Sequence, residues 1–272
     1  MGGAEISACH KPAGGEEIGD IWSCATLGLV DGLPAAIGGE LTAESLLEAC
    51  RRGLLCEPTA EPDRVTENRT AYAVDVEDGT VPTLPGNADP YSILWWSPAS
   101  RYVIPASSIR INRTLRRRLR QTSWTTTVDR CFDEVLKGCR ENRDRQWLMA
   151  DYMHSLTSLH EAGRVQSLEV WEESCLVGGL FGLSLGKVFV MESAFHRVPD
   201  AAKAAIADLA ERAARVGLQA LDAQVRSDYT VSMGASPMSR KTYLELLADD
   251  GTPQRIPSGE QAVARLVERA IE

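Results

Sequence analysis

The sequence predicts an α+β protein whose sheet is mostly antiparallel and flanked by helices. Three apolar runs at residues 166–171, 175–182 and 187–193 are separated by short turn segments, which predicts an antiparallel meander. Segments with helical spacing precede the meander, and an alanine-rich helix and one further strand at about 220–225 follow it. Helices and strands grouped in this way are typical of α+β architecture.

The composition is that of an ordinary globular chain. With 272 residues, 44% of them hydrophobic and 25% charged, the chain is long enough for one large domain or two smaller ones. The longest apolar stretch, residues 175–191, is interrupted by glycines and by Lys187, which favours strands over a membrane span. The first residues have neither the basic start nor the apolar run of a signal peptide, so none is expected.

The seven cysteines form no CxxC pair and no Cys/His grouping with zinc-ligand spacing. His154 and His160 lie in a helical segment without the HExxH arrangement, so both are interpreted as structural. We therefore expect a protein of the reducing cytoplasm that holds no metal ion.

Local signals place the remaining elements. Thr42, with Glu44 in the first turn, predicts a helix that ends near Gly53. Residues 57–90 are polar and contain five prolines, which predicts a long loop or insertion holding one short strand at 72–76. Further helices are predicted over residues 113–120, 128–138, 144–163, 200–217 with Asp200 as N-cap, and from Ser258 onward, where Ser258 and Gln261 have capping-box spacing.

Six arginines lie between Arg110 and Arg120 in a chain whose net charge is −9 and would be −15 without them. Four of them share one face of a helix, at i, i+3, i+4 and i+7: Arg113, Arg116, Arg117 and Arg120. Like charges on one stripe repel unless an anion lies against them, so the stripe predicts contact with a phosphate backbone. The alternative is a solvated basic helix face.

Polar residues also arrive in the predicted sheet. Asp222 and Gln224 share one face of the last strand, and Glu192 ends the third strand of the meander. Each is either an edge residue on the surface or part of a site. The chain contains no GxSxG, Walker, GxGxxG or Cys/His pattern, so an enzyme of this sequence would act by positioning two substrates and stabilising charge.

A long ordered series of motifs, spread over roughly two thirds of the chain, resembles the bacterial leucyl/phenylalanyl-tRNA–protein transferases. The matching residues are Gly38-Gly39-Glu40-Leu41-Thr42; Trp95-Trp96-Ser97-Pro98 with Arg101 and Pro105; Trp147; Leu159-His160 with Gly163; Ser167-Leu168-Glu169-Val170-Trp171; Leu176-Val177-Gly178-Gly179-Leu180-Phe181-Gly182; Glu192-Ser193-Ala194-Phe195; Asp222-Ala223-Gln224; Ser232-Met233-Gly234-Ala235; Arg240; and Tyr243-Leu244.

The resemblance implies a cytoplasmic, monomeric enzyme without a cofactor. Its parts would be an N-terminal α/β domain (residues 1–98, with the insertion at about 57–90), a GNAT-like acyltransferase domain (99–250) and a helical tail (251–272). Such enzymes move an aminoacyl group from tRNA to the N-terminal amine of a protein that begins with Arg or Lys, and the product is a degradation signal. By the same resemblance, Arg113, Arg117 and Arg120 contact tRNA, and Trp147 stacks on its terminal adenosine.

The implied catalytic residues are Asp222, Gln224 and Glu192, around the reacting ester. An aminoacyl ester is already activated, so a neutral amine attacks it without a covalent enzyme intermediate. A carboxamide is a poor base, so Gln224 is expected to orient the amine by hydrogen bonding, with Asp222 polarising it.

The chain departs from the family pattern at several positions. Glu57 stands where the family has a tryptophan and is followed by an insertion of roughly 20 residues or more. That adenosine-stacking group is therefore expected to be either lost or replaced from the insertion, by Tyr72 or Tyr91. Gln166 replaces a histidine, and Ala223 replaces a cysteine. The predicted aminoacyl pocket is apolar and comprises Leu180, Phe189, Met191, Ala194, Ile206 and Leu221. Leu180 and Ala194 stand in place of methionines, and Met191 stands in place of a glycine. Substitutions of this size change the discrimination between aminoacyl side chains by about 1–3 kcal/mol.

Three functions follow. The first is transfer of an apolar aminoacyl group (Leu, Phe or Met type) from tRNA to a protein N-terminus. The second keeps this chemistry but uses a small amine or peptide, as in natural-product assembly, and the third is a tRNA-binding protein without catalysis. An acetyl-CoA-dependent enzyme is disfavoured because the chain has no Q/RxxGxG/A pyrophosphate loop.

Overall fold

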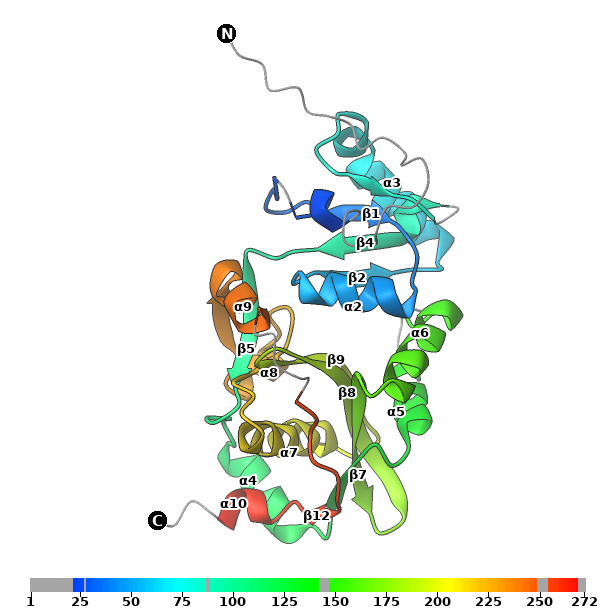
Figure 1. Cartoon of the computed structure of the whole chain (residues 1–272). Helices are drawn as coiled ribbons and strands as arrows, with labels where there is room; N and C mark the ends of the chain where they lie inside the picture. The colour runs from blue at the N-terminus through cyan, green and yellow to red at the C-terminus, as the bar shows by residue number, and fades with distance from the viewer. Residues whose placement is uncertain (1–21, 27, 87–88, 142–146, 249–253, 269–272) are drawn as a thin grey trace. The chain divides into compact units, whose positions relative to one another are not determined.

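The computed structural model describes residues 22–26, 28–86, 89–141, 147–248 and 254–268 (Figure 1). The chain divides into two compact units. The first contains residues 1–99 and 144–155, and the second contains residues 100–143 and 156–272. Helix α6 (Ala150–Glu161) contributes residues to both units. No described helix is both long enough and apolar enough to cross a membrane.

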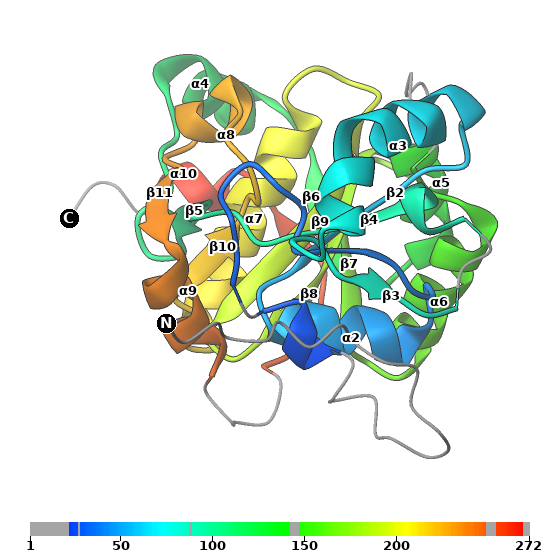
Figure 2. The same cartoon turned by 90° about the horizontal axis from the view of Figure 1, so that it is seen from above.

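The first unit is built on a four-stranded sheet of order β2-β4-β1-β3. Its strands are β1 (Ala36–Gly38), β2 (Leu55–Pro58), β3 (Thr83–Leu84) and β4 (Ile93–Trp96), and a 3₁₀ turn, η1 (Pro90–Ser92), precedes β4. Helices α2 (Ala43–Arg51) and α3 (Pro62–Glu77) lie on opposite sides of these strands, as the view in Figure 2 shows. The predicted cap of α2 is confirmed, because Thr42 Oγ1 accepts a hydrogen bond from the Ser45 amide at 3.1 Å.

The prediction of a loop with a strand over residues 57–90 is wrong, because the 16-residue helix α3 occupies most of this segment. Pro62 stands at its first turn, where a missing N–H costs nothing, so the proline that argued against a helix begins one. Val65, Tyr72 and Val76 pack against a cluster that includes Ile37 and Leu94. The insertion therefore adds a packed layer to the first unit.

The second unit is built on an eight-stranded sheet of order β11-β5-β10-β9-β8-β7-β6-β12. Its strands are β5 (Ser100–Pro105), β6 (Thr125–Val128), β7 (Val165–Glu172), β8 (Cys175–Leu185), β9 (Val188–His196), β10 (Ala220–Asp222), β11 (Ser236–Ser239) and β12 (Gln261–Ala262). Every neighbouring pair is antiparallel except β9 and β10. The predicted α+β class, the mostly antiparallel sheet and the β7-β8-β9 meander are confirmed.

Helices cover both faces of this sheet. They are α4 (Arg113–Gln121), α5 (Phe132–Arg140), α7 (Ala201–Arg215), α8 (Asp228–Ser232), α9 (Arg240–Leu247) and α10 (Arg265–Glu268). Two adjacent glycines of β8 show which faces of the sheet α7 and α5 cover. A Cβ on Gly178 would lie 2.7 Å from Ala201 of α7, and one on Gly179 would lie 3.3 Å from Val135 of α5. Because successive strand residues face opposite ways, α7 and α5 pack on opposite faces (Figure 1).

Several predicted boundaries differ from the structure. The helix predicted from residue 128 starts at Phe132, because Val128 ends β6. The helix predicted over 144–163 begins at Ala150, and residues 144–146 lie outside the described part of the chain. Asp200 precedes α7, but it has a left-handed φ of 71° and makes no capping bond; its carboxylate pairs with Lys203 at 3.0 Å.

The helix predicted from Ser258 is also wrong. Gln261 and Ala262 instead pair with β6, and only Arg265–Glu268 is helical. Ile256, Val263 and Val267 are buried in the core of the second unit, so the segment is anchored by packing as well as by pairing.

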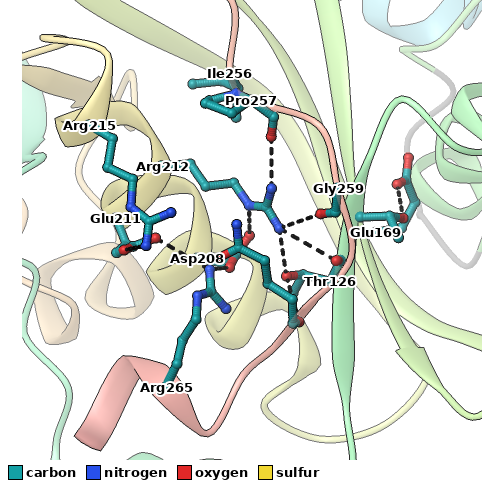
Figure 3. A network of polar contacts seen from close by, with 12 residues as sticks. Thr126, Glu169, Asp208, Glu211, Arg212, Arg215, Ile256, Pro257, Gly259 and Arg265 are labelled. Carbon is teal, nitrogen blue, oxygen red and sulfur yellow. Dashed lines mark hydrogen bonds and ion pairs between the residues drawn. The ribbon is translucent and has the colours of Figure 1, made fainter. Parts of the chain in front are cut away.

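A buried arginine fastens this segment (Figure 3). Arg212 of α7 is fully buried, and its guanidinium donates to Asp208 at 2.7 Å, to the Pro257 carbonyl at 2.7 Å and to the Gly259 carbonyl at 2.9 Å. A further bond reaches Thr126 Oγ1 of β6 at 3.2 Å. Arg265 of α10 pairs with Asp208 and Glu211 of α7. All three guanidinium nitrogens of Arg212 are thus satisfied.

We expect Arg212→Met to lower the free energy of unfolding by about 3 kcal/mol or more, because it leaves buried acceptors without their donor. Urea unfolding followed by tryptophan fluorescence measures the change. Arg215→Met, one turn along α7 with a side chain 40% exposed, is the matched control and should cost no more than about 1 kcal/mol. Equal losses in both variants would contradict this role for Arg212.

Candidate active site and nucleic-acid interface

The candidate active site lies where β9 and β10 separate. These parallel strands pair from Val188↔Ala220 to Val190↔Asp222, where the ladder ends. Strand β9 continues to His196, whereas the chain after Asp222 stays bonded to β5 through Ala223 N to Tyr102 O at 2.8 Å and Tyr102 N to Gln224 O at 3.2 Å. The sheet therefore opens between the carboxyl ends of β9 and β10.

The Asp222 carboxylate is fully buried at the end of β10. Its Oδ2 accepts from Arg101 Nη2 at 2.5 Å and from the Tyr243 hydroxyl at 2.7 Å, and its Oδ1 accepts from the backbone N–H of Gln224 at 2.7 Å. Arg101 and Tyr243 are themselves 2% and 1% exposed. Both carboxylate oxygens thus face protein donors.

Gln224 leaves the strand in an unusual conformation. Its φ is 65°, in the left-handed region that residues other than Gly, Asn and Asp rarely adopt. The alternation predicted for residues 220–225 therefore stops at Asp222, and Gln224 does not share its strand face. Gln224 is half-buried, and backbone strain of this kind is concentrated at functional sites.

Glu192 occupies a β-bulge on the facing strand. The β8–β9 register passes from Phe181↔Ser193 to Gly182↔Met191, so Glu192 is the extra residue of β9. Bulges redirect side chains and are common beside active sites. Gly182 allows this close approach, because a Cβ there would clash with the Val190 carbonyl oxygen. Glu192 and Gln224 each stand two residues beyond the Val190↔Asp222 pair.

The six residues of the predicted aminoacyl pocket all lie in or against one apolar cluster between the sheet and α7. Leu180, Phe189, Ile206 and Leu221 are at most 2% exposed. Met191 and Ala194 are only half-buried and pack against this cluster. Met191 immediately precedes the bulged Glu192. Met191 and Ala194 therefore bring the apolar cluster to the opening between β9 and β10.

The predicted arginine helix is confirmed as α4. Asn112 caps it by accepting from the Leu115 amide at 2.9 Å, and Leu115 and Leu119 are buried in the core. The arginines occupy the other face: Arg113, Arg117, Arg118 and Arg120 are exposed, and Arg116 is half-buried. Within the described residues, no carboxylate lies within 4 Å of these five guanidinium groups.

A groove of about 440 Å³ runs beside α4. Arg117 and Arg118 line it together with uncharged hydrogen-bonding side chains (Thr114, Gln121, Thr122 and Ser123), and Glu172 and Asp200 complete its wall. Guanidinium, hydroxyl and amide groups are the side chains that contact phosphate and sugar oxygens in nucleic-acid complexes. The groove and the exposed arginines form one candidate nucleic-acid interface.

Trp147 lies in the first unit, half-buried, and lines a small pocket with residues of β2 and α3. The other lining residues are Glu57, Pro58, Thr59, Glu61, Arg64 and Asn68. Arg64 pairs with Glu67 at 2.7 Å and with Glu57 at 3.7 Å. Tyr91 is buried, and Tyr72 packs edge-on against Trp96, so neither of the predicted aromatic replacements lines this pocket.

Two polar residues of the site were not among the predicted site residues. Arg101 and Tyr243 stand 121 and 21 residues from Asp222, so no local pattern joins them. Both do fall within the motif series, which is the signal that could have found them. Within the described residues, no group of three or more His, Cys, Asp or Glu side chains is arranged to hold a metal ion.

Comparison with known proteins identifies the protein as an aminoacyltransferase. The sequence profile described as leucyl/phenylalanyl-tRNA protein transferase matches residues 103–248. The leucyl/phenylalanyl-tRNA–protein transferase of Syntrophobacter fumaroxidans is 36% identical over 224 residues, 81% of this chain and 83% of that protein. That of Shewanella piezotolerans is 36% identical over 215 residues, 78% and 79%. That of Methylococcus capsulatus is 40% identical over 167 residues, 60% and 70%.

The chain belongs to the leucyl/phenylalanyl-tRNA–protein transferase family. The resemblance drawn from the motif series is thereby confirmed, and with it the assignment as an enzyme that transfers an aminoacyl group.

Proposed function

We propose that this protein transfers an apolar aminoacyl group from tRNA to the N-terminal amine of a protein or peptide. The observation that carries the proposal is the opening between β9 and β10, where Gln224, the bulged Glu192 and an apolar cluster meet in a member of this family. Ester and amine held together at that opening would react as an intramolecular pair, which supplies most of the acceleration without a covalent intermediate.

Gln224 is the residue proposed to orient the attacking amine, through its carboxamide. Asp222 is buried and hydrogen-bonded at both oxygens, so it is proposed to act through Gln224 rather than on the amine. Glu192 is proposed to attract the positive charge of an acceptor that begins with Arg or Lys. The product would then be a degradation signal, as in N-degron tagging.

The donor side chain is proposed to enter beside Met191 and Ala194, the two half-buried members of the apolar cluster. Leu180, Phe189, Ile206 and Leu221 form the floor beneath them. An apolar floor favours Leu, Phe or Met, and one methylene more or less in such a pocket is worth about 1–3 kcal/mol. Residues 191 and 194 therefore determine which aminoacyl group is preferred.

The tRNA is proposed to bind through Arg113, Arg116, Arg117 and Arg120 of α4, with its terminal adenosine stacked on Trp147. Arg64 lines the same pocket as Trp147, and a planar guanidinium stacks on bases as an aromatic ring does. We infer that Arg64 of α3 supplies the second stacking group, because Glu57 has no aromatic ring that could stack on a base. A domain of GNAT-like type, a monomeric state and a cytoplasmic location, where charged tRNA is found, complete the proposal.

The proposed function is tested by incubating the protein with tRNA charged with a mixture of labelled amino acids, with and without a peptide that begins with Arg. Label on the peptide, carried mostly by Leu, Phe or Met, is the expected result. A peptide with an acetylated N-terminus is the control and should remain unlabelled. Label on small amines only would support natural-product assembly instead, and binding of tRNA without any transfer would indicate a non-catalytic protein.

Charge reversal tests the nucleic-acid interface. Arg113→Glu with Arg117→Glu should weaken tRNA binding and reduce the slope of log affinity against log salt by about 0.7–0.9 for each phosphate that is no longer neutralised. Filter binding between low and moderate salt measures the slope. Lys137→Glu on α5, an exposed lysine outside the proposed interface, is the control that changes net charge equally per site. An unchanged slope in the double variant would remove α4 from the interface.

Gln224→Ala should slow transfer by about 10-fold or more, since it removes one oriented hydrogen bond at the reacting centre. The affinity for charged tRNA should stay within about twofold, because Gln224 belongs neither to α4 nor to the pocket that Trp147 lines. Single-turnover transfer and tRNA binding are measured on the same preparation. Parallel loss of both would show that Gln224 has a structural role.

A further inference from the structure

Two buried arginines of the second unit differ in how their donors are used. Arg212 directs all three guanidinium nitrogens to protein acceptors. Arg101 is only 2% exposed, yet within the described residues only its Nη2 has hydrogen-bond partners, and Nε and Nη1 have none. Unsatisfied buried donors are costly, so Arg101 is a poor choice for stability alone.

The partners that Arg101 does have are those of the candidate active site. Nη2 donates to Asp222 at 2.5 Å and to the Tyr243 hydroxyl at 3.0 Å, and the guanidinium carbon lies 4.5 Å from the centre of the Tyr243 ring. Burial opposes the charge of Arg101, but Asp222 and Tyr243 outweigh it and raise its pKa above the ordinary value. Burial, followed by Asp222, raises the pKa of Tyr243, so its hydroxyl keeps the proton that it donates to Asp222.

The same carboxylate holds Gln224. While Oδ2 accepts from Arg101 and Tyr243, Oδ1 accepts from the backbone N–H of Gln224 at 2.7 Å. That bond forms just where the chain leaves β10, and it stabilises a left-handed φ of 65° that a glutamine disfavours. The Gln224 backbone, from which the carboxamide side chain projects, is therefore held by the Asp222 carboxylate.

We propose that Arg101 and Tyr243 are positioning residues of the transferase, an inference that rests on the proposed function. They clamp one oxygen of Asp222 so that the other fixes the Gln224 backbone and aims its carboxamide at the opening between β9 and β10. Neither residue touches the substrates. Their contribution reaches the reaction only through Gln224.

The test compares Tyr243→Phe and Arg101→Lys with the unaltered protein. Tyr243→Phe removes one hydroxyl and keeps the ring beside Arg101, and Arg101→Lys keeps the charge but loses the planar group. Each should lower kcat about 10-fold or more, since a hydrogen bond to a charged group contributes at least this much. KM for charged tRNA and the tRNA dissociation constant should stay within about twofold.

Two further measurements separate positioning from general damage. In a Gln224→Ala background, Tyr243→Phe should cause no additional loss of kcat, because the two changes lie on one path. Hydrogen exchange at the Gln224 amide should be faster in Tyr243→Phe, a readout that does not depend on activity. Arg212→Lys, which alters the other buried arginine, is the control: it should lower stability while leaving both kcat below the melting temperature and Gln224 exchange unchanged.

Wild-type kcat in Tyr243→Phe, or a full additional loss in the Gln224→Ala background, would overturn the positioning role and leave the proposed function standing. Absence of transfer by the unaltered protein would overturn the proposed function itself. In that case faster exchange at Gln224 would still report the clamp, so the two failures are distinguishable.

Discussion

The site depends on one feature of the sheet: β9 and β10 run parallel for three residue pairs and then separate. Parallel neighbours need a crossover, and α7 supplies it by packing across the sheet between them. The short β10 ends while β9 continues, so the opening forms at the carboxyl ends of the two strands. Ligands of open sheets bind at such places because two chain segments diverge there.

The arginine helix illustrates how a basic surface arises in an acidic protein. Leu115 and Leu119 anchor α4 in the core that α7 and the sheet share. Their spacing leaves the remaining positions to face solvent, and arginines fill most of them. Because these cations lack carboxylate partners within the described residues, their charge stays available to an anion. An apolar stripe that packs into the core and a basic stripe that faces solvent thus share the nine residues of α4.

How much of the fold and site is predictable depends on the sequence distance of the contacts. Strand alternation and glycine turns are local, so the meander and the mostly antiparallel sheet could be predicted. Helical spacing is local too, and it predicts α4. The Arg101–Asp222 pair joins residues 121 positions apart, and no periodicity encodes it. The left-handed φ of Gln224 interrupts the strand after Asp222, so local alternation alone extends the strand wrongly to residue 225.

Two polar side chains tie a strand to another segment of the chain. The first is Gln166 of β7, whose carboxamide accepts from the Ile256 backbone N–H at 2.7 Å and donates to the Ile256 carbonyl at 3.2 Å. A second bond from the same amide nitrogen reaches Asp129 at 2.8 Å. One carboxamide serves both backbone groups of a single residue, because it carries a donor and an acceptor side by side.

Ile256 belongs to the C-terminal segment that follows the matched residues 103–248. Gln166 therefore helps to anchor this segment to the sheet. The second is Arg64 of α3, which pairs with Glu57 of β2 at 3.7 Å in the first unit. In both places the role of a strand residue is seen only together with the segment that lies against it.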